Sequence, residues 1–211
     1  MCRTTRLKPP PLFLNGRPNI AFESLSRQPG GKELWTANEE ALTVDGGVST
    51  PQHGTVVRLL RYSPAVEADG AGSTRSAGPA KQFAYITDPM HGGDIYGGRS
   101  GLVDLAVLPN GKMLALERSF ALSIPNFFQN RLYELDFAGA TEVSKFVDGL
   151  DGEVFTPVSK CLLWSGHVGN LEGLALGPLL GSGNRVLLGI VDNGDPLSTN
   201  QLVAFELHCP G

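Results

Sequence analysis

The sequence predicts an all-β fold that resembles part of a β-propeller, with about three four-stranded blades forming an open arc. Glycine and proline are frequent, at 27 and 15 of 211 residues, and no long segment repeats apolar residues at helical spacing. Short apolar runs bounded by turn residues recur along the whole chain. Three pairs of these runs form similar hairpins, roughly 70 to 80 residues apart, which is typical of repeated blades with long connecting loops.

The first blade is expected to begin after a proline-rich, polar segment, residues 1–19, which we expect to be disordered. Residues 20–211 would then form one partial propeller domain. The first hairpin spans residues 20–40 and turns at Gly30-Gly31. Two further apolar runs, at 55–62 and 81–87, are expected to complete the blade.

The second and third hairpins carry clearer turn signals. Asn110-Gly111, between the strands of the hairpin at 101–118, is a pair that favours a two-residue type I′ turn. The third hairpin spans residues 170–193, and its turn is expected near Ser182. The remaining predicted strands lie at 130–137, 141–146, 158–164 and 201–207.

Each hairpin carries acidic residues at the end away from its turn. Counting outward from the turns predicts three facing pairs: Glu172 with Asp192, Asp104 with Glu117, and Glu23 with Asn38, next to Glu39. Like charges directly opposite each other in a β-ladder are destabilising. A compensating group is therefore expected at this end of the sheets.

Several motifs, taken in order, resemble the phytase-like domain family, described as esterase-like activity of phytase, from about residue 19 to 207. They lie at residues 22–25 (FESL), 37–42 (ANEEAL), 101–105 (GLVDL), 114–120 (LALERSF), 131–136 (RLYELD), 170–178 (NLEGLALGP) and 192–193 (DN). The resemblance implies a propeller-like fold and a phosphoester hydrolase whose recurrent Glu and Asp are functional. The family domain usually has further blades before the first motif, so we interpret the chain as a C-terminal portion. The family's Asp-Asn-Asn is Asp192-Asn193-Gly194 here.

In a propeller the innermost strand of each blade lines a central channel, so acids from three blades should converge there. Carboxylates together with amide oxygens suit a hard cation such as Ca²⁺, which would offset their repulsion and help to polarise a water molecule. The metal ligands would be Glu23, Glu39, Asp104 and Glu172. The catalytic residues would be Glu117, Glu172 and Asp192, with Arg118, Asn170 and Asn193 binding a small phosphoester substrate.

The sequence is also compatible with other roles for these acids. Arg118 could offset the acids in a purely structural ring of ion pairs. The chain could be a non-catalytic propeller fragment that acts as a binding scaffold, or another Ca²⁺-dependent propeller hydrolase such as a lactonase. An open arc also leaves exposed sheet edges, so we expect that a homodimer or a complementing chain could close the ring.

Other features disfavour several classes of function. The net charge of −4 gives no general attraction to nucleic acid or to an anionic membrane, so neither is expected as a partner. The Gly-x-Ser-x-Gly nucleophile elbow of serine hydrolases is absent, because the segment that begins Gly98-Arg99-Ser100-Gly101 has Leu102 where the motif requires its second glycine. Of the histidines, His91 and His167 are candidates for general acids or for structural hydrogen bonding. No feature of the sequence indicates a compartment.

The cysteines do not suggest a metal site. Cys2, Cys161 and Cys209 are widely spaced and lack a C-x-x-C pair, which argues against zinc. Cys161 lies in an apolar run and is expected to be a small buried side chain. A bridge between Cys161 and Cys209 is left open.

Overall fold

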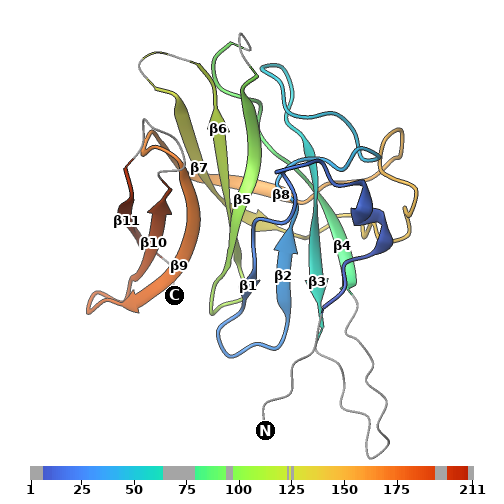
Figure 1. Ribbon diagram of the computed structural model, residues 1–211. Coiled ribbons are helices and arrows are strands. Elements are labelled where there is room, and N and C mark those ends of the chain that lie inside the picture. Colours follow the sequence, from blue (N-terminus) through green and yellow to red (C-terminus); the bar gives the residue numbers. More distant parts are fainter. Residues whose placement is uncertain are drawn as a thin grey trace, which may run out of the picture.

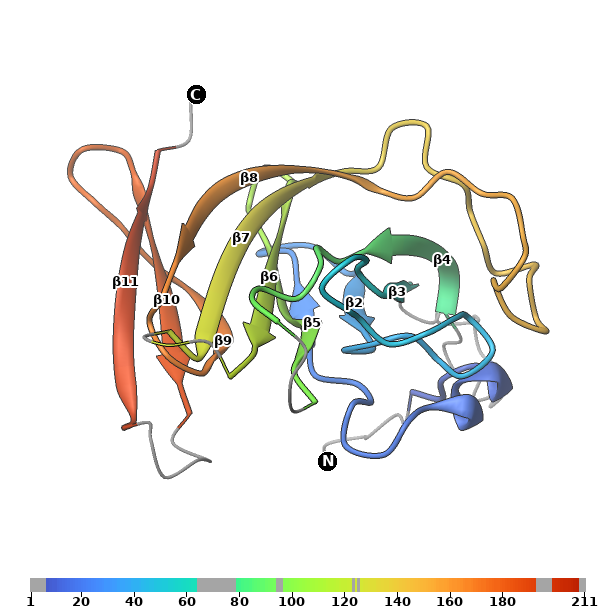
Figure 2. The ribbon, with the colours of Figure 1, turned by 90° about the horizontal axis from the view of Figure 1, so that it is seen from above.

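The computed structural model describes residues 7–63, 79–93, 97–122, 124, 126–192 and 199–208. Within this part of the chain, three antiparallel sheets of 4, 4 and 3 strands stand next to one another and do not close a ring (Figures 1 and 2). The sole helix in the described residues is a short 3-10 turn, η1 (Pro11–Asn15). The predicted fold class, an all-β arc of propeller-like blades, is confirmed.

The first sheet has the strand order β1-β2-β3-β4. Its strands are β1 (Ser26–Arg27), β2 (Leu34–Ala37), β3 (Val56–Tyr62) and β4 (Pro79–Ile86). Gly30, with φ +74°, supplies the left-handed backbone that the first hairpin turn requires. This is the turn that the sequence predicted.

The second and third sheets each begin with a predicted hairpin. The second has the order β5-β6-β7-β8, with β5 (Arg99–Val107), β6 (Met113–Phe120), β7 (Phe128–Asp136) and β8 (Ser159–Gly166). The third consists of β9 (Leu171–Leu179), β10 (Arg185–Val191) and β11 (Gln201–Leu207), with β10 in the middle. Among the described residues it therefore has three strands, one fewer than predicted.

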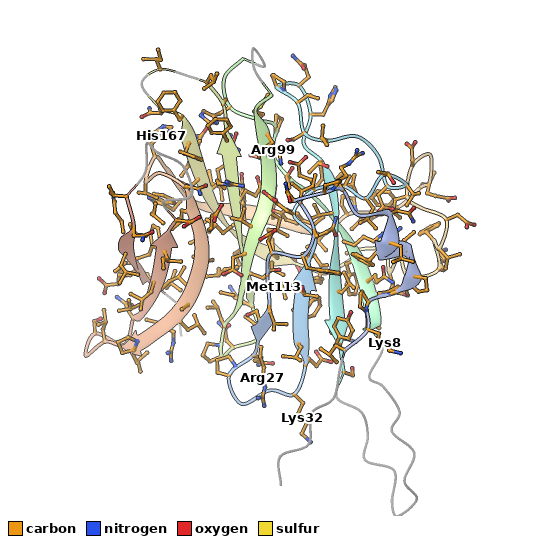
Figure 3. All side chains as sticks on the ribbon, viewed as in Figure 1. Lys8, Arg27, Lys32, Arg99, Met113 and His167 are labelled. Carbon is orange, nitrogen blue, oxygen red and sulfur yellow. The ribbon has the colours of Figure 1, made fainter. Side chains whose placement is uncertain are left out.

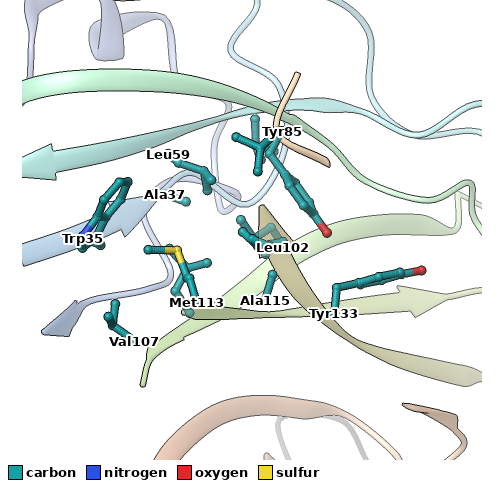
Figure 4. Close-up of a cluster of buried hydrophobic side chains, with 13 residues drawn as sticks. Trp35, Ala37, Leu59, Tyr85, Leu102, Val107, Met113, Ala115 and Tyr133 are labelled. Carbon is teal, nitrogen blue, oxygen red and sulfur yellow. The ribbon is translucent and has the colours of Figure 1, made fainter. Parts of the chain in front are cut away.

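Neighbouring sheets pack face to face through apolar side chains. Between the first and second sheets, the buried cluster includes Tyr85, Leu102 and Met113 (Figure 4). Between the second and third sheets, Leu116 and Leu187 belong to two further clusters. The second sheet is thus covered on both faces, as a blade inside a propeller is.

The strand predicted at 141–146 is not present. Glu142 forms only an isolated bridge with Phe83, and the segment runs along β4, where Val143 N–H donates to the Gln82 carbonyl oxygen at 2.8 Å. Val143 and Leu150 pack against Ala84 on the face of the first sheet that points away from the second. The prediction failed because the apolar residues of this segment cover a sheet face instead of extending a ladder.

A buried ion pair lies under the same covering segment. The Arg58 guanidinium contacts both oxygens of Asp45 at 2.7 Å, and both side chains are completely buried. Asp45 also accepts from Leu150 N–H at 2.9 Å, and Arg58 donates to Gln82 Oε1 at 3.1 Å. The outer face of the first sheet is therefore closed by the chain itself.

The predicted facing pairs of acids are wrong by one or two residues. A β-bulge between Leu102 and Asp104 places Leu102, not Asp104, opposite Glu117. In the third hairpin a second bulge places Glu172 between the paired residues Leu171 and Gly173. An extra residue in one strand shifts the register and turns the following side chains to the other face.

The first hairpin shows a similar shift, since Phe22, not Glu23, is bridged to Asn38. Ser24 interrupts the ladder there, because its hydroxyl accepts from Ala37 N–H at 3.0 Å. Residues 7–19, the described part of the segment 1–19 that we expected to be disordered, are ordered by contacts with the first sheet and the loop after it. Leu12 is buried, and Arg17 donates to the carbonyl oxygens of Ala41 and Gly46.

Cys161 is exposed and free, contrary to the prediction that it is buried. Strand β8 lies at the outer edge of the second sheet, which leaves Cys161 facing solvent. Cys2 and Cys209 lie outside the described residues, so the proposed bridge does too.

In the part of the chain that the structure describes, no helix has the length and apolar character needed to cross a membrane.

Candidate functional site

Side chains from the second and third sheets, and from segments that flank the first sheet, line a pocket of about 120 Å³, which we call the acidic pocket. Its lining residues are Asn19, Glu23, Glu39, Val103, Arg118 and Glu172. Glu23 precedes β1 and Glu39 follows β2, whereas Arg118 lies on β6 and Glu172 on β9. The pocket therefore lies where the three sheets approach one another.

Arg118 links the carboxylates of the acidic pocket. Its Nη2 donates to Glu39 Oε1 at 2.8 Å, and its Nη1 donates to Glu172 Oε1 at 3.1 Å. Nη1 also donates to Asn170 Oδ1 at 2.6 Å. The structural ion pairs that the sequence left open are thus present, and they join all three sheets.

The charges in the pocket do not balance. Three carboxylates, from Glu23, Glu39 and Glu172, share one guanidinium. The pKa of Glu23 is raised by burial and by the charges of Glu39 and Glu172, although Arg118 opposes this. The pocket consequently keeps an excess of negative charge when all its acids are ionised.

These side chains do not form a ready-made metal centre. Among the residues that the structure describes, no three Asp, Glu, His or Cys side chains are placed so that they could hold a metal ion together. Three of the four predicted ligands, Glu23, Glu39 and Glu172, do line one pocket. Asp104, the fourth, does not line it.

Asp104 instead connects the second and third sheets through backbone hydrogen bonds. Its Oδ2 accepts from Leu174 N–H at 2.6 Å and its Oδ1 accepts from Leu105 N–H at 2.8 Å. Burial raises the pKa of Asp104 to about 6 even though both hydrogen bonds favour the ionised form. The bulge next to Asp104 in β5 accounts for this placement.

Glu117, one of the three predicted catalytic residues, lies on the opposite face of β6 from Arg118. It is completely buried between the first and second sheets, where it accepts from Tyr85 Oη at 2.5 Å and from Lys160 Nζ at 2.6 Å. Burial raises the pKa of Glu117, and the Lys160 charge opposes the shift. Asp88 N–H donates to its second oxygen at 2.8 Å. Glu117 is therefore separated from the acidic pocket by the sheet.

Two of the other predicted residues, Asp192 and Asn170, lie near the end of β10. Asp192 is exposed, and its N–H donates to the Asn170 carbonyl oxygen at 2.9 Å. Asn170 is buried and holds Arg118 through its side chain. Asn193 lies outside the described residues.

The two candidate histidines lie near each other but do not line the acidic pocket. Their ring centroids are 6.4 Å apart. His91 Nδ1 is 2.7 Å from Ser119 Oγ, and His167 Nδ1 is 2.8 Å from the Phe128 carbonyl oxygen. Figure 3 shows His167 at the end of the sheets opposite Arg27 and Lys32, which flank the first hairpin turn. These contacts support hydrogen-bonded structural roles.

Two polar residues were not singled out from the sequence. Asn19 lines the acidic pocket and has a φ of 60°, a left-handed conformation that asparagine tolerates better than most residues. Glu40 is almost completely buried, and neither of its oxygens forms a well-aligned hydrogen bond with the described residues. Burial raises the pKa of Glu40 to about 6, since Arg99, 3.8 Å away, and Ser49 N–H offset it only in part.

Comparison with known proteins identifies the family. A family model described as "Phytase-like: Esterase-like activity of phytase" matches residues 3–195. No curated protein matches the chain, and no solved structure does. The match covers most of the chain and includes every strand of the first two sheets together with the hairpin that carries Glu172. The chain belongs to the phytase-like family.

Proposed function

We propose that this phytase-like hydrolase acts on phosphoesters and that the acidic pocket is its active site. The observation that carries the proposal is the grouping of Glu23, Glu39 and Glu172 around Arg118 in one pocket. A guanidinium is suited to paired hydrogen bonds with a phosphate group, and carboxylates are suited to holding a cation that faces the same phosphate.

Arg118 would bind the phosphate. Of its two carboxylate partners, Glu172 is the weaker, because its bond is longer and its side chain is 37% exposed, against 5% for Glu39. A phosphate oxygen can therefore replace Glu172 at Nη1 while Glu39 and Asn170 keep the guanidinium in place. Glu39 acts as a positioning residue in this scheme.

Glu23 and Glu172 would hold a divalent cation, for which we propose Ca²⁺. Their oxygen donors and the excess negative charge of the pocket fit a hard cation, although they supply only part of a coordination shell. Substrate phosphate oxygens and water would complete the shell of about six to eight oxygen ligands that Ca²⁺ takes. The cation would neutralise phosphate charge during hydrolysis. Protonation of Glu23 would compete with it, so the activity should fall at acidic pH.

The proposal is tested by measuring phosphate release from inositol hexakisphosphate and p-nitrophenyl phosphate, with added Ca²⁺, with Mg²⁺ and with a chelator. We expect cation-dependent release that Glu172→Gln lowers roughly tenfold or more. Glu134→Gln is a matched control, since Glu134 is 33% exposed and pairs with Lys112 at 2.8 Å outside the pocket. No release under any condition, or equal losses in both variants, would contradict the proposal. Turnover of a lactone in place of the phosphoesters would point to a different hydrolase.

A further inference from the structure

Gly101 of β5 is paired directly with Arg118 of β6, the residue that supplies the guanidinium of the acidic pocket. The next residue, Leu102, donates its N–H to the Glu39 carbonyl oxygen at 2.9 Å, so Glu39 lies on the other side of β5 from β6. Glu39 therefore reaches Arg118 across Gly101. A glycine within a strand often marks a place where other atoms approach the backbone closely.

The space that a side chain would occupy at Gly101 is filled by Glu39. A Cβ at Gly101 would lie 2.6 Å from Glu39 Cγ and 3.2 Å from Glu39 Oε1. Carbon atoms in contact are normally about 3.5–4.0 Å apart, so a methyl group and the Glu39 side chain cannot share this space. Oε1 is the atom that accepts from Arg118 Nη2 at 2.8 Å. A side chain at position 101 would therefore displace the ion pair itself.

The backbone conformation of Gly101 does not require glycine. Its φ lies outside the left-handed region, in contrast to Gly30 and Gly111 in the hairpin turns. Alanine could adopt the same backbone, and glycine in the middle of a strand is destabilising relative to alanine. The close approach of Glu39 explains the glycine at this position, and the local shape of the chain does not.

We propose that Gly101 is a positioning residue of the acidic pocket, because its bare backbone lets the Glu39 carboxylate lie across β5 and hold Arg118. This inference rests on the proposed function, in which Arg118 binds phosphate through Nη1 while Glu39 occupies Nη2. With Nη2 held, the guanidinium presents one fixed edge to the phosphate, and little further ordering is needed on binding. Gly101 acts through Glu39 and does not contact the substrate.

The test is the steady-state hydrolysis of p-nitrophenyl phosphate by the whole chain in the presence of Ca²⁺. Displacement of Glu39 in Gly101→Ala frees the Arg118 guanidinium, so we expect KM to rise roughly tenfold and kcat to change less than about threefold. A loss of folded protein alone would lower the apparent kcat and leave KM unchanged.

Gly177→Ala is the matched control, because a Cβ at Gly177 of β9 would lie 2.9 Å from Val186 Cβ. It introduces a similar clash within a strand but does not touch Glu39. We expect this variant to keep the KM of the wild type.

A second comparison uses Glu39→Ala, which removes the side chain that fills the space. If Gly101 acts through Glu39, KM is already raised in Glu39→Ala, and adding Gly101→Ala should change it by less than about twofold. Equal rises of KM in the two backgrounds would overturn the proposal. So would a Gly101→Ala variant with the KM of the wild type.

Urea denaturation separates a failure of this proposal from a failure of the proposed function, because it needs no turnover. We expect Gly101→Ala to lower the midpoint in the wild-type background. The decrease should be much smaller in Glu39→Ala, where the nearest remaining atom is the carbonyl oxygen of residue 39, 3.0 Å away. This pattern without phosphate release would mean that Gly101 positions Glu39 but that the acidic pocket is not the active site. An equal decrease in both backgrounds would show that Gly101 does not act through Glu39.

Discussion

The Arg118 guanidinium lies 2.8 Å from Glu39 Oε1, and this ion pair joins strand β6 of the second sheet to the chain that leaves β2 of the first. Both side chains are mostly buried. A second bond from the same guanidinium reaches Glu172 on β9. One side chain therefore holds together the three sheets at the place where their acids are most crowded.

Replacing Arg118 should destabilise the protein, and the size of the loss should depend on pH. Arg118→Met leaves Glu39 buried without its counter-charge, which we expect to cost about 3 kcal/mol at neutral pH. The loss should be smaller at pH 5 than at pH 8. The pKa of Glu23 is raised, and protonation of Glu23 removes its repulsion by Glu39 and Glu172. Urea denaturation at the two pH values measures both effects.

Lys112→Met serves as the control for this experiment. It removes an ion pair with Glu134 in which the two side chains are 50% and 33% exposed, so we expect a change of only about 0.5 kcal/mol. If both substitutions cost the same, Arg118 would not have the structural role that its contacts indicate.

Replacing Glu40 should stabilise the protein at pH 8, whereas replacing Arg118 should destabilise it. Its pKa is raised from 4.5 to about 6 by burial, so the folded state favours the protonated form, and stability is lost as the pH rises through about 6. Glu40→Gln removes the buried charge and should stabilise the protein at pH 8 by about 1–2 kcal/mol. The weak 3.8 Å pair with Arg99, which is half-exposed, should offset little of this gain.

The measurement for Glu40 is the free energy of unfolding between pH 4 and 8. The stability of the variant and the wild type should converge below pH 4.5. A variant that is less stable than the wild type at pH 8 would show that a group near Glu40 compensates for its charge.

The sequence predicted the strands better than it predicted their register. Turn residues such as Asn110-Gly111 and Gly30 define where each hairpin reverses, and β11 has the predicted bounds. The bulge beside Asp104 has no signal in the apolar pattern, because the residues on both sides of it are apolar. One added residue was enough to move Asp104 away from the position opposite Glu117.

The sequence predicted part of the candidate site, because some of its residues do not depend on the exact strand register. Glu23, Glu39 and Glu172 were grouped correctly because strand ends at one edge of a propeller come together whatever their exact register. Arg118 was proposed as a substrate ligand or an ion-pair partner, and the structure shows the ion pairs. Lys160 was not anticipated, because it lies 43 residues from Glu117 in the sequence and on a different strand.

Asp104 provides a further test, because it connects β5 to β9. Asp104→Ala removes the acceptor of the Leu174 N–H and should cost about 1–3 kcal/mol. The pKa of Asp104 is raised to about 6, so its contribution to stability is largest below pH 3.8 and is lost as the pH rises through 6. The cost of the substitution should therefore be larger at pH 4 than at pH 8.

Hydrogen exchange reports on the same contact directly. The Leu174 amide should exchange faster in Asp104→Ala than in the wild type, whereas amides in the first sheet should not change. Unchanged protection of Leu174 would mean that another group accepts its hydrogen bond.

Lys160 offers the sharpest test of the buried contacts between the first and second sheets. Its Nζ lies 2.6 Å from Glu117 and 2.7 Å from Asp88, and 4.3 Å from the centroid of the Tyr133 ring. Lys160→Met leaves a fully buried carboxylate without its cation, which should cost about 3–5 kcal/mol. The pKa of Glu117, already raised by burial, should rise further, so the loss should be greater at pH 8 than at pH 5.

A second substitution separates the loss of charge pairing from the loss of packing. In Lys160→Met combined with Glu117→Gln, the amide oxygen can still accept from Tyr85 Oη, and no buried charge remains at that position. We therefore expect the double variant to be more stable than Lys160→Met alone and nearly independent of pH between 5 and 8. Thermal unfolding of both variants at the two pH values checks this. If the double variant is as unstable as the single one, the aliphatic stem of Lys160 and its contact with Tyr133 dominate, and the buried ion pair contributes little to holding the two sheets together.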